Sequence, residues 1–559
     1  MRLMRRILPL AAVLLLIACS DEPTDPRPAE GPLPEGPLPE ELLPEFYGTL
    51  EPFASEAVYF LLTDRFVDGD ASNNHVDQGG AERGTFDRPI QLEGREPANI
   101  GYLGGDFKGI LDNADYLADM GFTAIWITPI VDNPDEAFMG GLPPGEEGGA
   151  DRGKTGYHGY WGVNFFAVDE HLESADLRFA DLTRRLEDEH GLKLVLDVVC
   201  NHGSPAYTMP EDQPKFGELY DADGQLVADH MNLHPGELDP NEPLHAMYRR
   251  EPDLAELSDL DYDNPAVLDY CVAAHSKWLG QGASAMRIDT IKHMPIEFWR
   301  GFAERIRERF PGLFMFAEAF SYDAEFIGRY TFPENGGISV LDFPGREAMH
   351  AVFADGAPYS ALETYLHLDS GVYGNPYDLM TFYDNHDMPR MAADANGFID
   401  AHNWLFTSRG IPVVYYGSES TFRAGTDQHG GNRDYFGQEN VELAKTHDVH
   451  AALSRIAGLR QRLVSLQRGV QVNLDFAEDT AAFYRVYQRD GASETALVLL
   501  NKSGEDVTLT VTEWIGNELW KDASTAQTLQ WTAENPNVNV TIGAHDVRVL
   551  ISEAPRSSL

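Results

Sequence analysis

The 559-residue sequence has few cysteines and few basic side chains. Its three cysteines are Cys19, Cys200 and Cys271, so a framework of several disulfides is excluded. We expect Cys200 and Cys271 to be buried thiols, although a single bridge between them stays open. Lys and Arg number 42 against 90 Asp and Glu, and the formal net charge of −48 would repel nucleic acid and anionic headgroups. A neutral or cationic partner is therefore expected, and nucleic acid is not.

The N-terminus has the layout of an export signal. The stretch MRLMRRILPLAAVLLLIACS combines a basic start with an apolar run that is shorter than a membrane span, which predicts a signal over residues 1–18. Residues 16–19, LIAC, resemble a bacterial lipobox, which implies cleavage before Cys19 and a lipid on its thiol. An ordinary secretory signal with an incidental cysteine is the alternative. The Pro- and Glu-rich residues 19–46 predict an extended tether.

These features together predict an exported protein. The lipid on Cys19 would hold it to a bacterial membrane, by preference the outer membrane, and a periplasmic or secreted protein is the alternative. We expect a monomer.

From about residue 56 to residue 420, short apolar runs alternate with amphipathic helical stretches, which is the pattern of repeated βα units. The eight candidate strands are AVYFLLT, FTAIWIT, LKLVLDVV, SAMRI, LFMFAE, ISVLDF, LMTFYD and PVVYYG. Eight such units predict an α/β fold, a (β/α)₈ TIM barrel with its catalytic residues at the C-terminal ends of the strands.

Two segments depart from this alternation. Residues 203–258, after the third strand, are rich in Pro, Gly and Asp and too long for a plain loop, which predicts a small inserted domain B. It would divide the barrel into residues 47–202 and 259–468. Residues 469–559 contain short alternating strands between polar turns, which predict a C-terminal antiparallel β-sandwich domain.

Polar side chains gather where the predicted strands end. They are Asp197, Asn201 and His202 after the third strand, Arg287 and Asp289 after the fourth, Glu318 after the fifth, and His386 and Asp387 after the seventh. Strand ends of a barrel meet at one mouth, so we expect these groups to converge. Helix capping explains any one of them equally well. It is a poor explanation for Asp289, Glu318 and Asp387 together.

Paired carboxylates near a neutral substrate suit glycoside hydrolysis. Arg287 lies two residues before Asp289 and therefore on the same strand face, where its charge would keep Asp289 ionised as a nucleophile. Glu318 follows the apolar run LFMFA and is a candidate for the raised pKa that a general acid requires.

Four stretches in order carry a resemblance to a known family. They are LVLDVVCNH (194–202), SAMRIDTIKH (284–293), FMFAEAF (314–320) and TFYDNHD (381–387). They resemble the four ordered regions of the α-amylase family, glycoside hydrolase family 13, with Ala317 where the family commonly has glycine. The resemblance implies retaining double displacement, with Asp289 as nucleophile, Glu318 as acid/base and Asp387 stabilising the oxocarbenium-like transition state.

The same resemblance implies a set of sugar contacts. The stretch GYHGYWG (156–162) is similar to a family stretch that stacks and hydrogen-bonds a glucose ring, although its aromatic side chains could equally fill a loop core. The stretch GTDQHGGNRDYF resembles an Asp and Arg pair beside the preceding subsite. The implied substrate-binding residues are Tyr157, His158, Tyr160, Trp161, His202, Arg287, Lys292, His293, His386, Asp427 and Arg433.

One or two calcium ions are also expected. Asp68, Asp70, Asn73 and Asn74 form a Gly-containing turn of hard oxygen ligands, for which an acidic surface turn is the alternative. The turn resembles the N-terminal calcium loop of cyclodextrin glucanotransferases and related amylases, which implies Gly104 and Asp106 as further ligands. The resemblance implies a second calcium on Asn201, Asp259 and the backbone carbonyl of His293.

The resemblance leaves the activity open between hydrolysis and transfer. Cyclising enzymes carry a bulky aromatic residue four positions before the calcium aspartate, where this sequence has Ala255. The chain also has one β domain after the barrel and only a short tether before it, which disfavours glucanotransferases and cyclomaltodextrinase-like enzymes respectively. We therefore expect an endo-acting α-amylase that cuts internal α-1,4 bonds of starch or maltodextrin. The alternatives are an α-glucan transferase, a cyclomaltodextrinase-like enzyme and a non-catalytic glucan-binding lipoprotein.

Overall fold

The computed structural model describes residues 45–78, 84–94, 96–144, 151–515, 518–532 and 534–553. The predicted signal and almost all of the predicted tether lie outside these residues. None of the described helices is long and apolar enough to cross a membrane.

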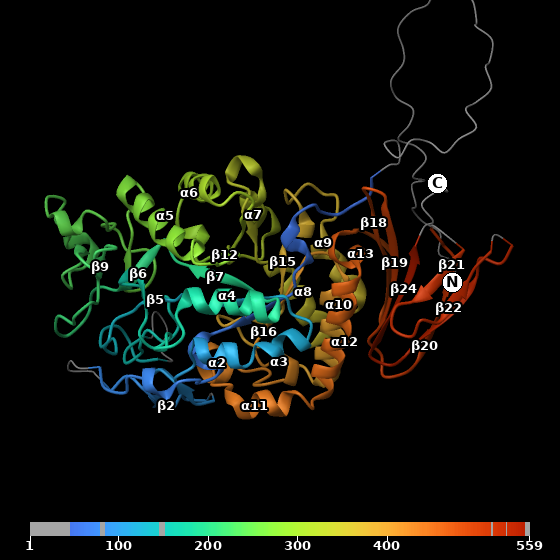
Figure 1. The fold of residues 1–559 in the computed structure, drawn as a ribbon, viewed down its shortest axis with the longest axis horizontal. Helices are drawn as coiled ribbons and strands as arrows, with labels where there is room; N and C mark the ends of the chain where they lie inside the picture. The colour runs from blue at the N-terminus through green and yellow to red at the C-terminus, as the bar shows by residue number, and fades with distance from the viewer. Residues whose placement is uncertain are drawn as a thin grey trace, which may run out of the picture. The chain divides into compact units, whose positions relative to one another are not determined.

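Eight parallel strands form one sheet in the order β14-β13-β12-β7-β4-β1-β16-β15. A parallel bridge between Leu341 and Met380 joins the two ends of this order, so the sheet closes on itself. The barrel predicted from the sequence is confirmed (Figure 1). Seven of its strands lie within a predicted run, and β16 begins at Ile411, one residue before the last run. The strands are β1 (Val58–Leu61), β4 (Ala124–Ile127), β7 (Lys193–Val198), β12 (Ala285–Ile288), β13 (Phe314–Ala317), β14 (Ser339–Val340), β15 (Met380–Thr381) and β16 (Ile411–Tyr415).

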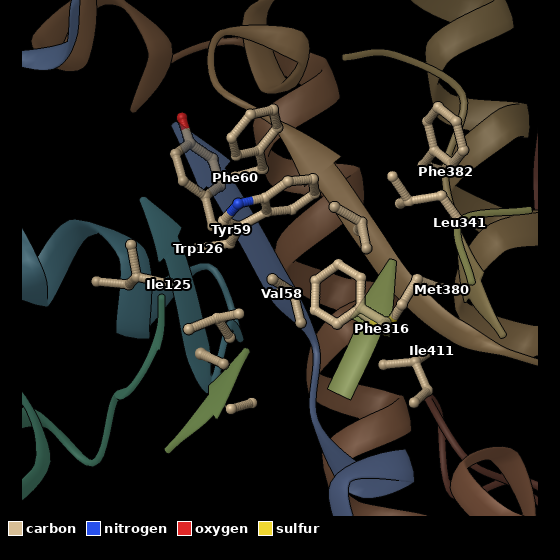
Figure 2. Close-up of a cluster of buried hydrophobic side chains, with 14 of the residues drawn as sticks. Val58, Tyr59, Phe60, Ile125, Trp126, Phe316, Leu341, Met380, Phe382 and Ile411 are labelled. Carbon is tan, nitrogen blue, oxygen red and sulfur yellow. The ribbon is translucent and has the colours of Figure 1, made fainter. Parts of the chain in front are cut away.

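The barrel strands are apolar because both of their faces are buried. Figure 2 shows the side chains that fill the interior, among them Phe60, Trp126 and Phe316. Phe60 stacks on Trp126 with 3.8 Å between ring centroids, and Trp126 meets Phe316 edge-on at 5.3 Å. The filled interior leaves the strand ends as the place for polar groups.

Helices follow the barrel strands, as the βα alternation predicts. Between β4 and β7, α4 ends at His190 and is capped by Gly191, whose φ of +68° is a left-handed conformation that glycine adopts without strain. The helices are α1 (Thr63–Phe66), α2 (Phe107–Asp112), α3 (Ala114–Asp119), α4 (Phe179–His190), α5 (Pro265–Leu279), α6 (Ile296–Arg309), α7 (Ala324–Gly328), α8 (Phe343–Phe353), α9 (Glu363–Leu366), α10 (Ala395–Thr407), α11 (Gly437–Ala444), α12 (Asp448–Arg462) and α13 (Val464–Arg468).

The segment after β7 forms short antiparallel pairs of its own. They are β8 (His202–Pro205) with β11 (Leu257–Asp259), and β9 (Glu218–Tyr220) with β10 (Leu226–Asp229). Two further strand pairs lie in the loops of the barrel, β2 (Pro89–Ile90) with β3 (Ala98–Asn99) and β5 (Val131–Asp132) with β6 (Asn164–Val168). A small apolar cluster joins the segment to the loop after β4, through Phe138, Trp161, Met209, Phe216 and Leu257.

An antiparallel domain closes the chain, as predicted. Its larger sheet has the order β17-β18-β19-β24-β21-β22, and β20 pairs with β23. The strands are β17 (Val470–Phe476), β18 (Thr480–Arg489), β19 (Ala492–Asn501), β20 (Val507–Val511), β21 (Leu519–Asp522), β22 (Thr528–Gln530), β23 (Val538–Ile542) and β24 (Asp546–Glu553). A second hydrophobic core around Trp520 and Leu497 lies within it. In the barrel, Cys200 and Cys271 are buried free thiols.

Candidate active site

Arg287, at the end of β12, is the centre of the polar network at the barrel mouth. Its Nη1 lies 2.7 Å from Asp289 Oδ1 and 2.8 Å from Asp197 Oδ1, and its Nη2 donates to Glu318 Oε2. All four side chains are buried. The strand ends predicted to converge therefore do so, around one guanidinium group.

Strand register explains this convergence. Arg287 pairs with Asp197 on β7 and with Phe316 on β13, two residues before Glu318. The backbone continues the alignment past the strands, because Asp289 N donates to Val198 O at 2.9 Å and Glu318 N donates to Ile288 O at 2.8 Å. The two carboxylates are consequently held at adjacent strand ends.

Asp197 is a site residue to which the sequence analysis assigned no role. It accepts hydrogen bonds from Trp126 Nε1 at 3.0 Å and Tyr160 OH at 2.8 Å, besides the contact with Arg287. Burial raises its pKa to about 7. Its position at a strand end was the signal in the sequence that it belongs to the site. By accepting hydrogen bonds from Arg287 and Tyr160, Asp197 orients both of these side chains.

Glu318 is the carboxyl group whose environment suits a general acid. Burial raises its pKa to about 8; Arg287 opposes this rise and the negative charges of Asp289 and Asp387 add to it. The group is therefore protonated at neutral pH, as the sequence led us to expect from the apolar run before it.

Asp387, after β15, lies in a contrasting environment. Burial would raise its pKa, but His386 and Arg433 outweigh that effect and hold the pKa below its usual range. Arg433 Nη2 lies 2.7 Å from Asp387 Oδ1, and His386 Nε2 lies 3.1 Å from Oδ2. One carboxyl group of the mouth is thus kept protonated and another ionised, which is the division that acid-assisted glycoside chemistry uses.

Arg433 also donates through Nε to the backbone carbonyl of His386, at 2.9 Å. The sequence placed Arg433 beside the preceding subsite together with Asp427. Its contacts put it at Asp387 itself, 46 residues earlier in the chain. Asp427 begins the turn that leads to Arg433, and its carbonyl accepts from Asn432 N at 3.1 Å.

The aromatic stretch after β4 is divided between site and core. Tyr160 stacks on His386 with 5.4 Å between centroids and 8° between planes, and its amide donates to His158 Nδ1 at 3.1 Å. Tyr157 lies under the Arg65 guanidinium, 3.6 Å from its ring centroid. Trp161, which the resemblance implied as a sugar platform, packs instead in the apolar cluster of the inserted segment and is 3% exposed. The loop-core alternative therefore describes Trp161 best.

Lys292 lies near Phe320, an aromatic side chain that the sequence analysis did not single out. Lys292 is exposed, and its Nζ donates to the carbonyl of Phe320 at 3.2 Å and lies 5.2 Å from that ring. His293 Nδ1 lies 3.3 Å from Asp253 Oδ2, and His202 is buried at the start of β8. Phe320 itself is 38% exposed. An aromatic residue two positions after the predicted acid was the signal available in the sequence.

The residues of the first predicted calcium site fit a bound Ca²⁺ ion. Asn73 Oδ1 and Asn74 Oδ1 are buried with no hydrogen-bond partner among the described residues. Asn74 Nδ2 donates to Asp68 Oδ2 at 2.9 Å, and Asn73 Nδ2 donates to Asp106 Oδ2 at 3.1 Å. A Cβ on Gly104 would lie 2.6 Å from Asn74 Oδ1, so this backbone approaches the set closely. These hard oxygens suit Ca²⁺, which would hold the N-terminal loop to the start of α2.

Asp70 differs from the other predicted ligands. Its Oδ1 accepts from the amide of Ser72 at 3.1 Å and from the Ser72 hydroxyl at 2.6 Å. The carboxylate thereby caps the short helical turn Ala71–Asn73.

The second predicted calcium site fits in part. Asp259 Oδ1 is buried without a partner among the described residues, while Oδ2 accepts from Asp253 N at 2.7 Å. Leu260 N donates to the carbonyl of Asn201 at 2.8 Å, so Asp259 and Asn201 lie on neighbouring segments. Burial raises the pKa of Asp259 to about 6, which a cation would offset. A calcium ion here would join the inserted segment to the barrel.

Removing calcium is expected to destabilise the protein. A ligand present at a hundred times its Kd contributes about 2.7 kcal/mol to folding, so a chelator should lower Tm and added Ca²⁺ should restore it. Calorimetric titration of chelated protein with CaCl₂ measures binding directly. Asp68→Ala should remove one binding event, whereas Asp70→Ala, the matched control, should keep it. Equal titrations for parent and Asp68→Ala would contradict the assignment.

Comparisons with known proteins agree with this fold. The family model described as "Alpha amylase, catalytic domain" matches residues 60–451. A cyclomaltodextrin glucanotransferase of Klebsiella oxytoca is 28% identical over 510 residues, covering 82% of this chain and 72% of that protein. An α-amylase of Niallia circulans is 29% identical over 465 residues, covering 81% of each chain. The chain spans 60% of the length of another glucanotransferase, from Thermoanaerobacterium thermosulfurigenes.

Among solved structures, the chain is similar to a cyclomaltodextrin glucanotransferase described as having a three-domain ABC distribution. The TM-score is 0.72 at 29% identity, and the match covers 89% of this chain and 99% of that one.

Proposed function

The chain belongs to the α-amylase family, and we propose that it is a retaining enzyme that cuts internal α-1,4 bonds of starch or maltodextrin. The observation that carries the proposal is the Arg287 guanidinium, which contacts Asp289, Asp197 and Glu318 at once. It places a candidate nucleophile beside a carboxyl group whose pKa is raised to about 8.

These residues would act in two steps. Protonated Glu318 donates its proton to the glycosidic oxygen while Asp289 attacks the anomeric carbon, so the bond to the leaving sugar breaks and a glycosyl–Asp289 ester forms. Glu318, now a carboxylate, takes a proton from water as that water attacks the same carbon and releases Asp289. Asp387, held ionised by Arg433, would stabilise the positive charge that develops on the sugar ring.

The acceptor in the second step decides between hydrolysis and transfer. The sequence analysis favoured hydrolysis partly because a single β domain follows the barrel. That argument does not discriminate, because the similar glucanotransferase has a three-domain ABC distribution. What still supports hydrolysis is Ala255, which is exposed in a left-handed conformation with φ +49°. A methyl group offers a glucan chain little surface to wrap around.

Product analysis from amylose tests the proposal. We expect linear maltooligosaccharides of several lengths from the first time points, as internal cleavage requires. Predominantly cyclic products would favour the glucanotransferase alternative, and glucose released only from chain ends would exclude endo action. No products at all would favour the non-catalytic binding protein.

Introducing an aromatic residue at position 255 is expected to increase transfer. Ala255→Tyr should raise the share of cyclic and transfer products severalfold, because an aromatic face binds the apolar face of a sugar. Ala255→Gly, which suits the left-handed backbone, is the matched control and should leave the ratio unchanged. An unchanged ratio in a folded Ala255→Tyr protein would show that position 255 does not determine the outcome.

We further propose that the enzyme is exported and held to a membrane by lipid on Cys19. The support is the lipobox-like LIAC stretch and the Pro- and Glu-rich residues after it. Labelled palmitate should be incorporated into the full-length protein and not into Cys19→Ser, which should be recovered in the soluble fraction. Absence of label from both proteins would leave the ordinary secretory signal as the explanation.

A further inference from the structure

Two tryptophans of the C-terminal domain present nearly parallel rings at its surface. Trp514 follows β20 and Trp531 follows β22; their ring planes differ by 12° and their centroids are 6.2 Å apart. Both side chains are half-buried. Trp520 lies fully buried beside them, edge-on to Trp514 at 5.4 Å.

Trp514 and Trp531 pack against the second hydrophobic core, but that core does not bury them completely. Trp520 already fills the interior, while the side chains next to the pair are turned outward: Ile515 is 40% exposed and Leu519 is 57% exposed. A pair of large aromatic side chains with exposed aliphatic neighbours is the kind of surface that proteins use for binding.

The pair is also held in place before any ligand arrives. Trp514 Nε1 donates to the carbonyl of Pro536 at 2.7 Å, and the amide of Trp531 donates to the carbonyl of Glu518 at 3.0 Å. The first bond fixes the ring of Trp514 and the second fixes the backbone of Trp531, and such ordering in advance lowers the entropy cost of binding.

We propose that Trp514 and Trp531 form a second α-glucan-binding site, apart from the barrel mouth. The flat rings suit the apolar faces of pyranose units, and the exposed carboxylates of Glu513 and Glu518 can accept hydrogen bonds from sugar hydroxyls. The identity of the ligand rests on the proposed function, because the same polymer would occupy both sites. Such a site would keep the enzyme on a polymer between cuts.

Charge argues against other occupants of this surface. Glu513 and Glu518 flank the pair, and the chain carries a net charge of −48. A second copy of the chain, an anionic lipid surface or a nucleic acid would therefore be repelled, whereas a neutral polysaccharide would not.

The test measures adsorption to granular starch in an Asp289→Asn background, so that the polymer is not consumed. The full chain with Trp514→Ala and Trp531→Ala should bind about tenfold more weakly, which corresponds to 1.4 kcal/mol. Trp514→Phe, which keeps an aromatic face, should retain part of the affinity. Val472→Ala is the matched control, because Val472 is a 44% exposed apolar side chain on β17 of the same domain.

The same substitutions without Asp289→Asn should leave kcat/KM on maltoheptaose unchanged. Undiminished adsorption of the double variant to starch overturns the inference. A sedimentation coefficient that differs between the double variant and the parent also overturns it, because it would show that the two tryptophans form a contact between copies of the chain. Amylose hydrolysis by the parent with undiminished adsorption of the double variant would reject this site alone. Absence of amylose hydrolysis would reject the proposed function. Calorimetric unfolding of each variant distinguishes a loss of binding from a loss of folding. If the alanine variants do not fold, the adsorption of folded Trp514→Phe to starch is the test.

Discussion

Replacing Asp289 by asparagine is expected to lower kcat on amylose by about 10⁴-fold or more, the scale on which loss of a covalent nucleophile acts. The amide has nearly the shape of the carboxylate and still accepts a hydrogen bond from Arg287, but it cannot form the glycosyl ester. Arg287 keeps its contacts with Asp197 and Glu318, so the fold should survive. Initial rates of reducing-sugar release measure the effect.

Asp263→Asn is the matched control for this variant. Asp263 is an exposed aspartate in the turn before α5, and the same chemical change there should leave kcat unaltered. Substantial activity in folded Asp289→Asn would remove Asp289 from the nucleophile role. Another carboxylate would then have to be the nucleophile, and Asp197, which also contacts Arg287, would be the first candidate.

Replacing Glu318 by glutamine is expected to lower kcat on amylose by about 10³-fold, because general acid–base catalysis contributes on the order of 10²–10⁴-fold. The loss should depend on the leaving group. An α-maltosyl fluoride needs little protonation to depart, so its glycosyl transfer to Asp289 should be lowered much less than amylose cleavage. Equal losses on both substrates would contradict a role for Glu318 as acid.

The pH profile of kcat/KM checks the same assignment. Burial raises the pKa of Glu318 to about 8, so the carboxyl group keeps its proton at neutral pH and loses it as the pH rises through that value. Since the protonated form is the active one, activity should fall on the alkaline side of about pH 8. The residual activity of Glu318→Gln should lack this alkaline limb, because glutamine does not titrate. An alkaline limb that persists in the variant would belong to another group.

Much of the fold could be predicted from the sequence because its signals are local. Apolar runs of strand length alternate with helical periodicity eight times, and seven of the eight barrel strands lie within a predicted run, while β16 begins one residue before its run. The polar residues at the ends of those runs were equally visible, since a barrel places its strand ends at one mouth. Asp289, Glu318 and Asp387 could be singled out in this way.

The partners of these residues could not be predicted, because they depend on register between strands far apart in the chain. The contact of Arg287 with Asp197 spans 90 residues, and that of Arg433 with Asp387 spans 46. The same reason explains the outcome for Trp161, which looked like a sugar platform beside Tyr160. Packing against Phe216 and Leu257 of the inserted segment buries it.

The sequence by itself determined the barrel, its order of strands along the chain and the residue types at its mouth, since these follow from hydrophobic period and local chemistry. Only the tertiary structure decided which carboxyl group is kept protonated and which tryptophans face outward. Burial and neighbouring charge set the pKa of Glu318, and the packing of two sheets around Trp520 leaves Trp514 and Trp531 at the surface. Both outcomes depend on groups brought together from distant parts of the chain.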